Sequence, residues 1–323
     1  MRRPGMAARP VLAFAGAALL AVSAVTGACA QPRPVAVPPD ACPFAGYPGR
    51  VAPVPGGPAD SSVAWFHAVP GVALGDPGPD AFRNADPDSS PRIVRAGSER
   101  VDTASYRAFR RGVAPLLERW ARDPRLAINP AYVAALLAKE SGFDPRAVSP
   151  HAALGYAQLT FAADSDMRII TRADSLSGWM CREVRGWPRD PRFHAAPASP
   201  GAVREMVASG SMGPRTEYLL DARASARAAV LWVRLLEAIW TESHWPGMYG
   251  DSARNRLNGG RPLSEGQLLE LVTASYNHGY PDVWNLVRDH GAAWKEHLPP
   301  EPRDYVERIR AYTIIFQQPR RPR

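Results

Sequence analysis

Residues 129–145 read NPAYVAALLAKESGFDP. Asn129 and Pro130 are residue types that helices favour at the N-cap and in the first turn. The apolar residues that follow recur at helical spacing, and Gly142 is a residue type that commonly ends a helix. The stretch therefore predicts a buried helix whose last turn carries Glu140.

Glu140 stands where a carboxylate is hard to ionise. The negative end of the helix dipole and the apolar neighbours both disfavour the charged form, so we expect the pKa of Glu140 to be raised. A raised pKa is what a general acid needs at neutral pH. An isolated glutamate at a helix end is usually a solvated surface residue, so a catalytic assignment depends on the sequence around it.

The rest of the chain after residue 100 carries further helix signals and no alternating run of the kind that forms strands. We therefore predict an all-α body of roughly 215 residues. The signals are an N-cap at Asp102, a break near Ala114 before Pro115, an amphipathic stripe after Asp221, a capping box at Ser264 to Gln267, and first-turn prolines at Pro281 and Pro302.

Residues 1–30 have the three parts of a secretory signal: basic residues, an apolar run of about 15 residues, and the small residues Ala28-Cys29-Ala30. That run is shorter than a membrane-spanning helix requires. Two cleavage patterns stay open, because the sequence fits ordinary cleavage before Gln31 and also resembles a lipobox at Cys29, with Thr26 where leucine is usual. We expect a periplasmic protein, or an outer-membrane lipoprotein anchored through Cys29.

Residues 31–100 are rich in proline and glycine and predict an extended linker or tether. Its few aromatic residues, Trp65 and Phe66 among them, leave open whether parts of it pack on the domain. In an oxidising compartment Cys42 and Cys181 could form a disulfide, or they could be two buried thiols.

The composition limits the classes of function. Of 323 residues, 46% are hydrophobic and 22% charged, so wholesale disorder is excluded. The net charge of +8 falls to +5 without residues 1–30, because three arginines and no acids are removed, and charge alone identifies no partner. The seven histidines form no HExxH motif, and no phosphate-binding or dinucleotide-binding glycine motif is present. We expect no metal, no cofactor and no nucleic acid.

Four blocks of sequence occur in the order seen in one enzyme family. They are Glu140-Ser141, the run Ser149 to Gln158 with its Ala153 and Gly155, Ser275-Tyr276-Asn277-His278-Gly279, and Glu301 to Val306. Together they resemble the soluble lytic transglycosylase family, whose members have a goose-lysozyme-like helical fold and cleave peptidoglycan. The resemblance covers about residues 125–316 and implies a catalytic domain over 101–318, with an insertion at about 161–215 that could cover the substrate cleft or bind another protein.

The resemblance implies a mechanism with one carboxylic acid. Glu140 would protonate the glycosidic oxygen between MurNAc and GlcNAc, and would then deprotonate the MurNAc C6 hydroxyl as it closes on C1 to form a 1,6-anhydro ring. Tyr276 is a candidate to orient Glu140 or the reacting substrate oxygen through its hydroxyl, although an aromatic residue at helical spacing is usually a core residue. The residues expected to bind substrate are Ser141, Ser149, Gln158, Tyr276, Asn277, Glu301 and Tyr305.

Several of these residues have a simpler explanation as well. Ser149 could be a turn cap, Gln158 an exposed amide, and Ser141 an ordinary helix-end residue. Asn277 more readily shapes the turn before Gly279, since asparagine tolerates the left-handed region. Glu301 could equally interact with the dipole at a helix N-terminus.

The chain departs from the family pattern mainly in its second block. Ala152, Tyr156 and Ala157 replace the usual glycine, leucine and methionine, and we expect Ala157 to leave a sugar contact open. Ser275, His278 and Pro302 replace the usual alanines and threonine of the later blocks.

Two alternatives to a lytic transglycosylase remain. A hydrolytic muramidase on the same scaffold would need a second carboxylate, for which Asp144, Asp164 and Asp166 are the nearest candidates. The other is a non-catalytic module that binds the cell wall. In each case the expected partners are peptidoglycan glycan strands, with envelope or secretion machinery as a further expectation.

Overall fold

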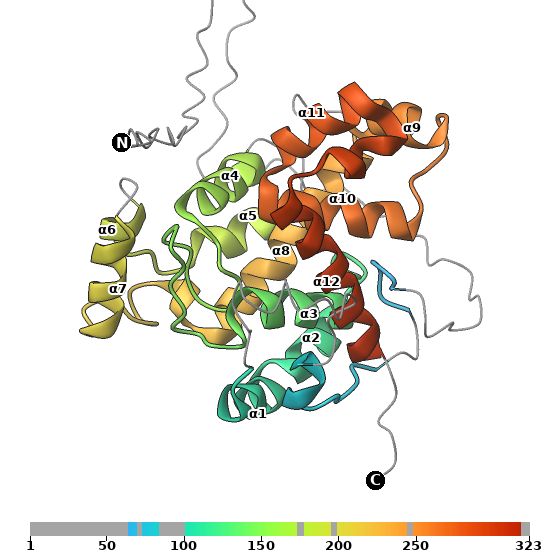
Figure 1. Ribbon diagram of the computed structural model, residues 1–323. Coiled ribbons are helices and arrows are strands. Elements are labelled where there is room, and N and C mark those ends of the chain that lie inside the picture. The colour runs from blue at the N-terminus through green and yellow to red at the C-terminus, as the bar shows by residue number, and fades with distance from the viewer. Residues whose placement is uncertain are drawn as a thin grey trace, which may run out of the picture. The chain divides into compact units, whose positions relative to one another are not determined.

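The computed structural model describes residues 64–69, 73–83, 101–172, 178–194, 199–243 and 248–317. These residues contain twelve α-helices and three short 3-10 helices and, apart from isolated bridges, no strand (Figure 1), which confirms the predicted all-α fold. The α-helices are α1 Thr103–Gly112, α2 Ala114–Ala121, α3 Pro130–Ser141, α4 Phe161–Arg172, α5 Gly178–Arg185, α6 Pro191–His194, α7 Pro200–Ala208, α8 Ala222–Thr241, α9 Gly250–Asn258, α10 Glu265–His278, α11 Tyr280–His290 and α12 Pro300–Gln317. The 3-10 helices are η1 Pro79–Arg83, η2 Tyr218–Leu220 and η3 Gly291–His297.

The predicted caps start the helices where expected. The side chain of Asp102 accepts from the amide of Ser105, and that of Ser264 accepts from the amide of Gln267, whose own side chain completes the capping box. Val113 separates α1 from α2, so the break lies one residue before the expected Ala114, and Pro115 occupies the first turn of α2. These features are confirmed because a cap is decided by neighbouring residues alone.

The core is built around α3, α8, α10 and α12. In α3 every side chain from residue 130 to residue 138 is buried, and α3 packs along α12. α8 is buried over most of its length and contacts α3 and α10, while α10 contacts α12 and α11. Helices that are distant in sequence thus pack together in the core.

Part of the segment expected to be a tether belongs to this core. Phe66, Leu74 and Phe82 are at most 5% exposed. The amide of Asn129 donates to the Phe66 carbonyl over 2.9 Å, and the amide of Gly75 donates to the Phe316 carbonyl over 2.6 Å. We call residues 64–69 and 73–83 the N-terminal strap. The folded domain therefore starts before residue 101, which the absence of apolar periodicity in the strap concealed.

Other predictions fall outside the part of the chain that the structure describes. They are the signal at residues 1–30 with Cys29, most of the linker, and the pairing of Cys42 with the Cys181 side chain. Among the helices described, none is long and apolar enough to cross a bilayer.

Candidate active site

The end of α3 presents Glu140 as the sequence predicts. The Asn129 side chain accepts from the Ala131 amide over 2.9 Å, and Pro130 fills the first turn. Gly142 closes the helix in the left-handed conformation at φ +58°, where its amide donates to the Ala138 carbonyl. Glu140 is only partly buried, whereas the eight residues before Lys139 are fully buried. The carboxylate therefore stands at the boundary between the core and the surface, on a rigid support.

Tyr305 of α12 donates a hydrogen bond from its hydroxyl to Oε1 of Glu140. The ring is 4% exposed, and burial, followed by the negative charge of Glu140, raises the pKa of Tyr305 well above its usual value. Because the phenol stays protonated at any physiological pH, it can only act as a donor toward this carboxylate while the bond lasts. Tyr305 thus orients the carboxylate of Glu140.

Tyr276 behaves differently from the expectation. Its hydroxyl donates to the carbonyl of Ala157 over 2.7 Å, and its pKa is raised well above the usual value by burial and then by the charge of Glu140. We expected Tyr276 to orient Glu140 or the reacting substrate oxygen. Its phenol proton is instead donated to the loop, and Tyr305 supplies the hydrogen bond to Glu140. Tyr276 lies near the carboxylate and anchors the wall beside it.

That wall is the loop at residues 142–160, between α3 and α4. Three of its non-glycine residues have a positive φ, namely Phe143 (+66°), Ala152 (+60°) and Gln158 (+46°). Phe143 is fully buried and stacks on Phe109 with a centroid separation of 4.1 Å. Backbone conformations of this kind persist only where surrounding contacts hold them, and they are common at functional sites.

Two predicted substrate ligands use much of their hydrogen-bonding capacity inside this loop. The Ser149 hydroxyl oxygen accepts from the amides of His151 and Ala153, at 3.1 and 2.9 Å. The Gln158 side-chain amide donates to the carbonyls of Ala147 and Gly155, at 3.1 and 2.8 Å. Ser149 is thus a turn cap, as the simpler explanation held. The Gln158 side chain is not an exposed amide, because its hydrogen bonds stabilise the loop. Their roles in substrate binding stay predictions.

Gly155 and Ala157 hold the loop against η2 and α8. A Cβ atom on Gly155 would lie 1.7 Å from the Leu219 carbonyl oxygen, so only glycine permits this approach. The Ala157 amide donates to the Ser225 hydroxyl over 3.1 Å. Ala157 is fully buried, and its effect on the sugar contact stays a prediction. Sequence reasoning missed Ser225, although a serine within an otherwise apolar helical stripe is a signal that could have identified it.

The remaining predicted residues are less closely tied to Glu140. The Ser141 hydroxyl donates to the Leu137 carbonyl within α3. Asn277 is exposed and helical, so it does not shape the turn by a left-handed conformation; Gly279 does so, at φ +88°. Glu301 is exposed in the first turn of α12. Nothing in these contacts decides whether the three residues bind substrate.

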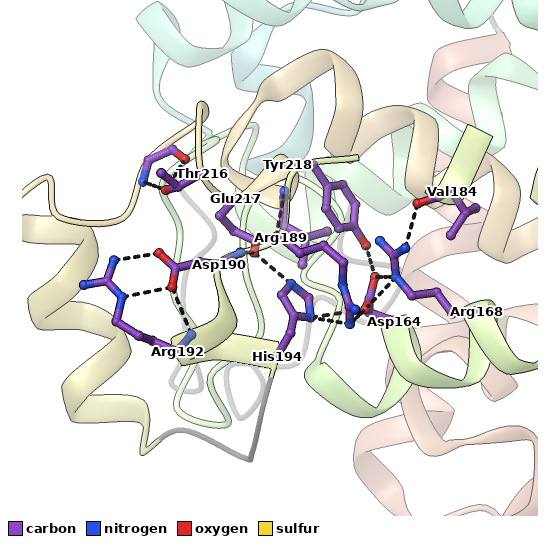
Figure 2. Close-up of polar contacts among 12 residues, drawn as sticks. Asp164, Arg168, Val184, Arg189, Asp190, Arg192, His194, Thr216, Glu217 and Tyr218 are labelled. Carbon is purple, nitrogen blue, oxygen red and sulfur yellow. Dashed lines mark hydrogen bonds and ion pairs between the residues drawn. The ribbon is translucent and has the colours of Figure 1, made fainter. Parts of the chain in front are cut away.

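The segment after the loop is organised by a buried charge network, shown in Figure 2. Asp164 is inaccessible to solvent and accepts from Nε of Arg168 (3.1 Å), Nη2 of Arg189 (2.6 Å) and the hydroxyl of Tyr218 (2.6 Å). His194 lies between Asp164 and Glu217, with nitrogen-to-oxygen distances of 3.1 and 2.8 Å. The network joins α4, α6 and η2 and the chain between them.

The network shifts the pKa values of its members in the directions that pairing predicts. Burial opposes the charged form of Asp164, but the hydrogen bonds from His194 and Tyr218 outweigh it and lower the pKa of Asp164. Burial likewise opposes the imidazolium of His194, and its two carboxylate partners nevertheless raise the pKa of His194. A carboxylate this well satisfied is unsuited to activate a water molecule, which disfavours Asp164 as a catalytic base.

The three candidate aspartates therefore differ in their surroundings. Asp144 is exposed, and its carboxylate accepts from the amide of Arg146. Asp164 is saturated by its donors, and Asp166 is half-buried. Among the residues that the structure describes, no three histidine, cysteine, aspartate or glutamate side chains lie together so that they could bind a metal ion.

The model of the Transglycosylase SLT domain matches residues 121–176. This match confirms the resemblance to the soluble lytic transglycosylase family. The matched stretch covers α3 with Glu140, the loop and α4, whereas Tyr276 and Tyr305 lie beyond it. Their place in the site rests on the geometry described above. Neither a comparison with curated proteins nor one with solved structures returned a match.

The SLT match supports peptidoglycan as the substrate and lytic transglycosylase-type activity at the level of the family. It also agrees with the all-α architecture.

Proposed function

We propose that this protein is an exported lytic transglycosylase that cleaves the β-1,4 bond between MurNAc and GlcNAc without consuming water. The observation that carries the proposal is the hydrogen bond from Tyr305 to Oε1 of Glu140, at the end of the helix that the SLT match includes. This hydrogen bond fixes the position of Oε1 and so sets the direction in which the carboxyl group presents its other oxygen. The positioning of an acid is worth as much to catalysis as its pKa.

In the first step, the protonated Glu140 gives its proton to the glycosidic oxygen, and the bond between that oxygen and C1 of MurNAc breaks. C1 becomes electron-poor, and the negative charge now on Glu140 stabilises the oxocarbenium-like centre. Tyr305 continues to donate to Oε1, so the ionised form is stabilised without a cation.

In the second step, Glu140 takes the proton of the MurNAc C6 hydroxyl as that oxygen bonds to C1. The product is a 1,6-anhydro ring, Glu140 is protonated again, and no water enters. One side chain thus acts as acid and then as base, and a second carboxylate is not required. The rigid wall of loop 142–160, held by Tyr276 and Ser225, fits a site that must hold the sugar while its own hydroxyl attacks.

The test is to digest purified sacculi and measure the masses of the released fragments. Wild type should release fragments lighter by one water than hydrolytic products, and Glu140→Gln should release essentially none. Glu205→Gln, which changes an exposed glutamate on α7, is the matched control and should match wild type.

Tyr305→Phe provides a second test of the same site. Loss of the donor should lower kcat by roughly 10- to 100-fold and move the basic limb of the pH–rate profile to higher pH, because protonated Glu140 is the reactive form and Tyr305 stabilises the ionised form. Cleavage by Glu140→Gln at the wild-type rate would refute the assignment of the acid. Fragments with reducing muramic ends would indicate a hydrolytic muramidase, and binding without cleavage in every variant would indicate a cell-wall binding module.

Export is part of the same proposal. A signal at residues 1–30 would place the domain beside its substrate in the periplasm, or on the outer membrane if Cys29 is lipidated. The mass of the mature N-terminus distinguishes cleavage before Gln31 from an acylated Cys29. A mature protein that retains residues 1–30 would contradict both.

A further inference from the structure

Phe82, in η1 of the N-terminal strap, is buried between two elements that belong to the candidate active site. It is 5% exposed. Its ring lies edge-on to the ring of Phe143 with a centroid separation of 6.3 Å, and edge-on to the ring of Tyr312 at 5.2 Å. The ring of Phe316 lies 5.3 Å away. The first of these partners belongs to the loop at residues 142–160, and the other two belong to α12.

On the loop side, the contact reaches the backbone that leaves Glu140. Phe143 follows Glu140 by three residues, and both Gly142 and Phe143 are left-handed, at φ +58° and +66°. A phenylalanine keeps that conformation only where surrounding contacts hold it. Five rings surround Phe143 with centroid separations from 4.1 to 6.4 Å, namely those of Phe82, Tyr106, Phe109, Tyr156 and Phe316. Phe82 thus helps to fix the turn in which α3 ends.

On the other side, the contact reaches the face of α12 that carries Tyr305. Tyr312 follows Tyr305 by seven residues, or two helical turns, so the two side chains lie on one face of the helix. Both are buried, and α12 packs along α3. The hydrogen bond from Tyr305 to Glu140 joins the same two helices. Because a hydrogen bond weakens steeply as donor and acceptor fall out of line, a small shift of α12 against α3 would weaken this one.

The strap holds Phe82 in place through contacts of its own. The Gly75 carbonyl accepts from Nη1 of Arg110 over 2.8 Å, and the Tyr106 hydroxyl donates to Oδ1 of Asp76 over 2.8 Å. Both partners lie on α1, which precedes α3 in the chain. The position of Phe82 is therefore set by α1 as well as by the two elements that it contacts in the site.

We propose that Phe82 is a positioning residue, which acts through Phe143 and α12 on the hydrogen bond between Tyr305 and Glu140. The inference rests on the proposed function in one respect, namely that Glu140 is the catalytic acid. Phe82 lies outside residues 121–176, which the SLT model matches. The strap would thus contribute to the geometry of the reaction as well as to the core.

The experiment is a double-mutant cycle on kcat, measured with the full chain on soluble, uncrosslinked glycan strands. Phe82→Ala should lower kcat by roughly tenfold in the wild-type background. In the Tyr305→Phe background, where the hydrogen bond is already absent, the same substitution should lower kcat by less than about twofold. Leu74→Ala is the matched control, because Leu74 is also a strap residue that is 5% exposed. It should lower the stability in urea unfolding and leave kcat unchanged in both backgrounds.

A milder variant keeps the experiment decisive even where Phe82→Ala does not fold. Phe82→Leu removes the ring and keeps an apolar side chain, and it should lower kcat by roughly threefold, again only where Tyr305 is present. An unchanged kcat in the folded Phe82 variants would overturn the inference. Equal losses in the two backgrounds, or an equal loss in Leu74→Ala, would do the same, since Phe82 would then act only on the fold.

The proposed function is judged by other measurements. The inactivity of Glu140→Gln and the masses of the wild-type products do not involve Phe82. The inference can therefore fail while Glu140 remains the acid, and cleavage by Glu140→Gln would refute the assignment of the acid whatever the Phe82 variants do.

Discussion

We expect the charged side chain of His67 to stabilise the packing of the N-terminal strap on the domain. The His67 ring contacts Oε1 of Glu265 through Nδ1 at 2.6 Å and Oε1 of Glu237 through Nε2 at 2.9 Å. Oε2 of Glu265 also accepts from the amides of Phe66 and His67. The side chain of His67 is only 14% exposed, so solvent screens these contacts weakly.

The magnitude follows from the pKa of His67. Burial opposes the imidazolium, but the hydrogen bonds and charges of Glu237 and Glu265 outweigh it and raise the pKa from 6.5 to about 9. That difference corresponds to about 3 kcal/mol of stability. Because the folded-state pKa is the higher one, the contribution is complete below pH 6.5 and disappears as the pH rises through 9.

The perturbation is His67→Gln, which removes the charge and keeps a hydrogen-bonding side chain. Urea unfolding should show a loss of about 3 kcal/mol at pH 6 and a difference close to zero at pH 10. His151→Gln, at an exposed histidine, should leave the stability within about 0.5 kcal/mol of wild type at both values. An equal loss at pH 6 and pH 10 would refute the reasoning, since the effect would then come from packing and not from charge.

Two further substitutions test the packing of the loop at residues 142–160 and the charge network around Asp164. Gly155→Ala places a Cβ atom 1.7 Å from the Leu219 carbonyl oxygen and should cost more than about 3 kcal/mol in urea unfolding. Gly210→Ala has a similar φ of +73° with nothing within 4 Å and should cost only about 1 kcal/mol; equal losses would exclude the clash as the cause. Asp164→Asn leaves the buried cations of its network without a counter-charge and should cost about 3–5 kcal/mol, whereas the exposed Asp282→Asn should be neutral. A mild effect of Asp164→Asn would show that the network is not held by charge.

Local signals made the helical body predictable. The caps at Asp102, Asn129, Asp221 and Ser264 each bond an amide two or three residues ahead, so the information lies within one turn of helix. The placement of Glu140 at the end of α3 followed from the same kind of signal. Nothing beyond the apolar run and the Ser141-Gly142 ending was needed.

Contacts between distant segments were not predictable in this way. Phe66 and Phe82 are single aromatic residues in a proline-rich stretch, and their burial depends on partners more than forty residues away. Likewise, the choice of Tyr305 over Tyr276 as the donor to Glu140 depends on how α10 and α12 pack beside α3. A single sequence carries no signal of that packing.

The sequence also could not separate the aspartates that a hydrolytic enzyme would need, and the structure does so. Asp144 is exposed and Asp164 is saturated, which leaves Asp166 as the remaining candidate for a base that activates water. The two possible roles of Asp166 give different products after substitution. If Asp166 activates water, wild type should yield reducing ends and Asp166→Asn should lose them. If Asp166 takes no part in the chemical step, every fragment that Asp166→Asn releases should still carry the 1,6-anhydro ring, because the attacking oxygen comes from the sugar and not from a water held by this carboxylate.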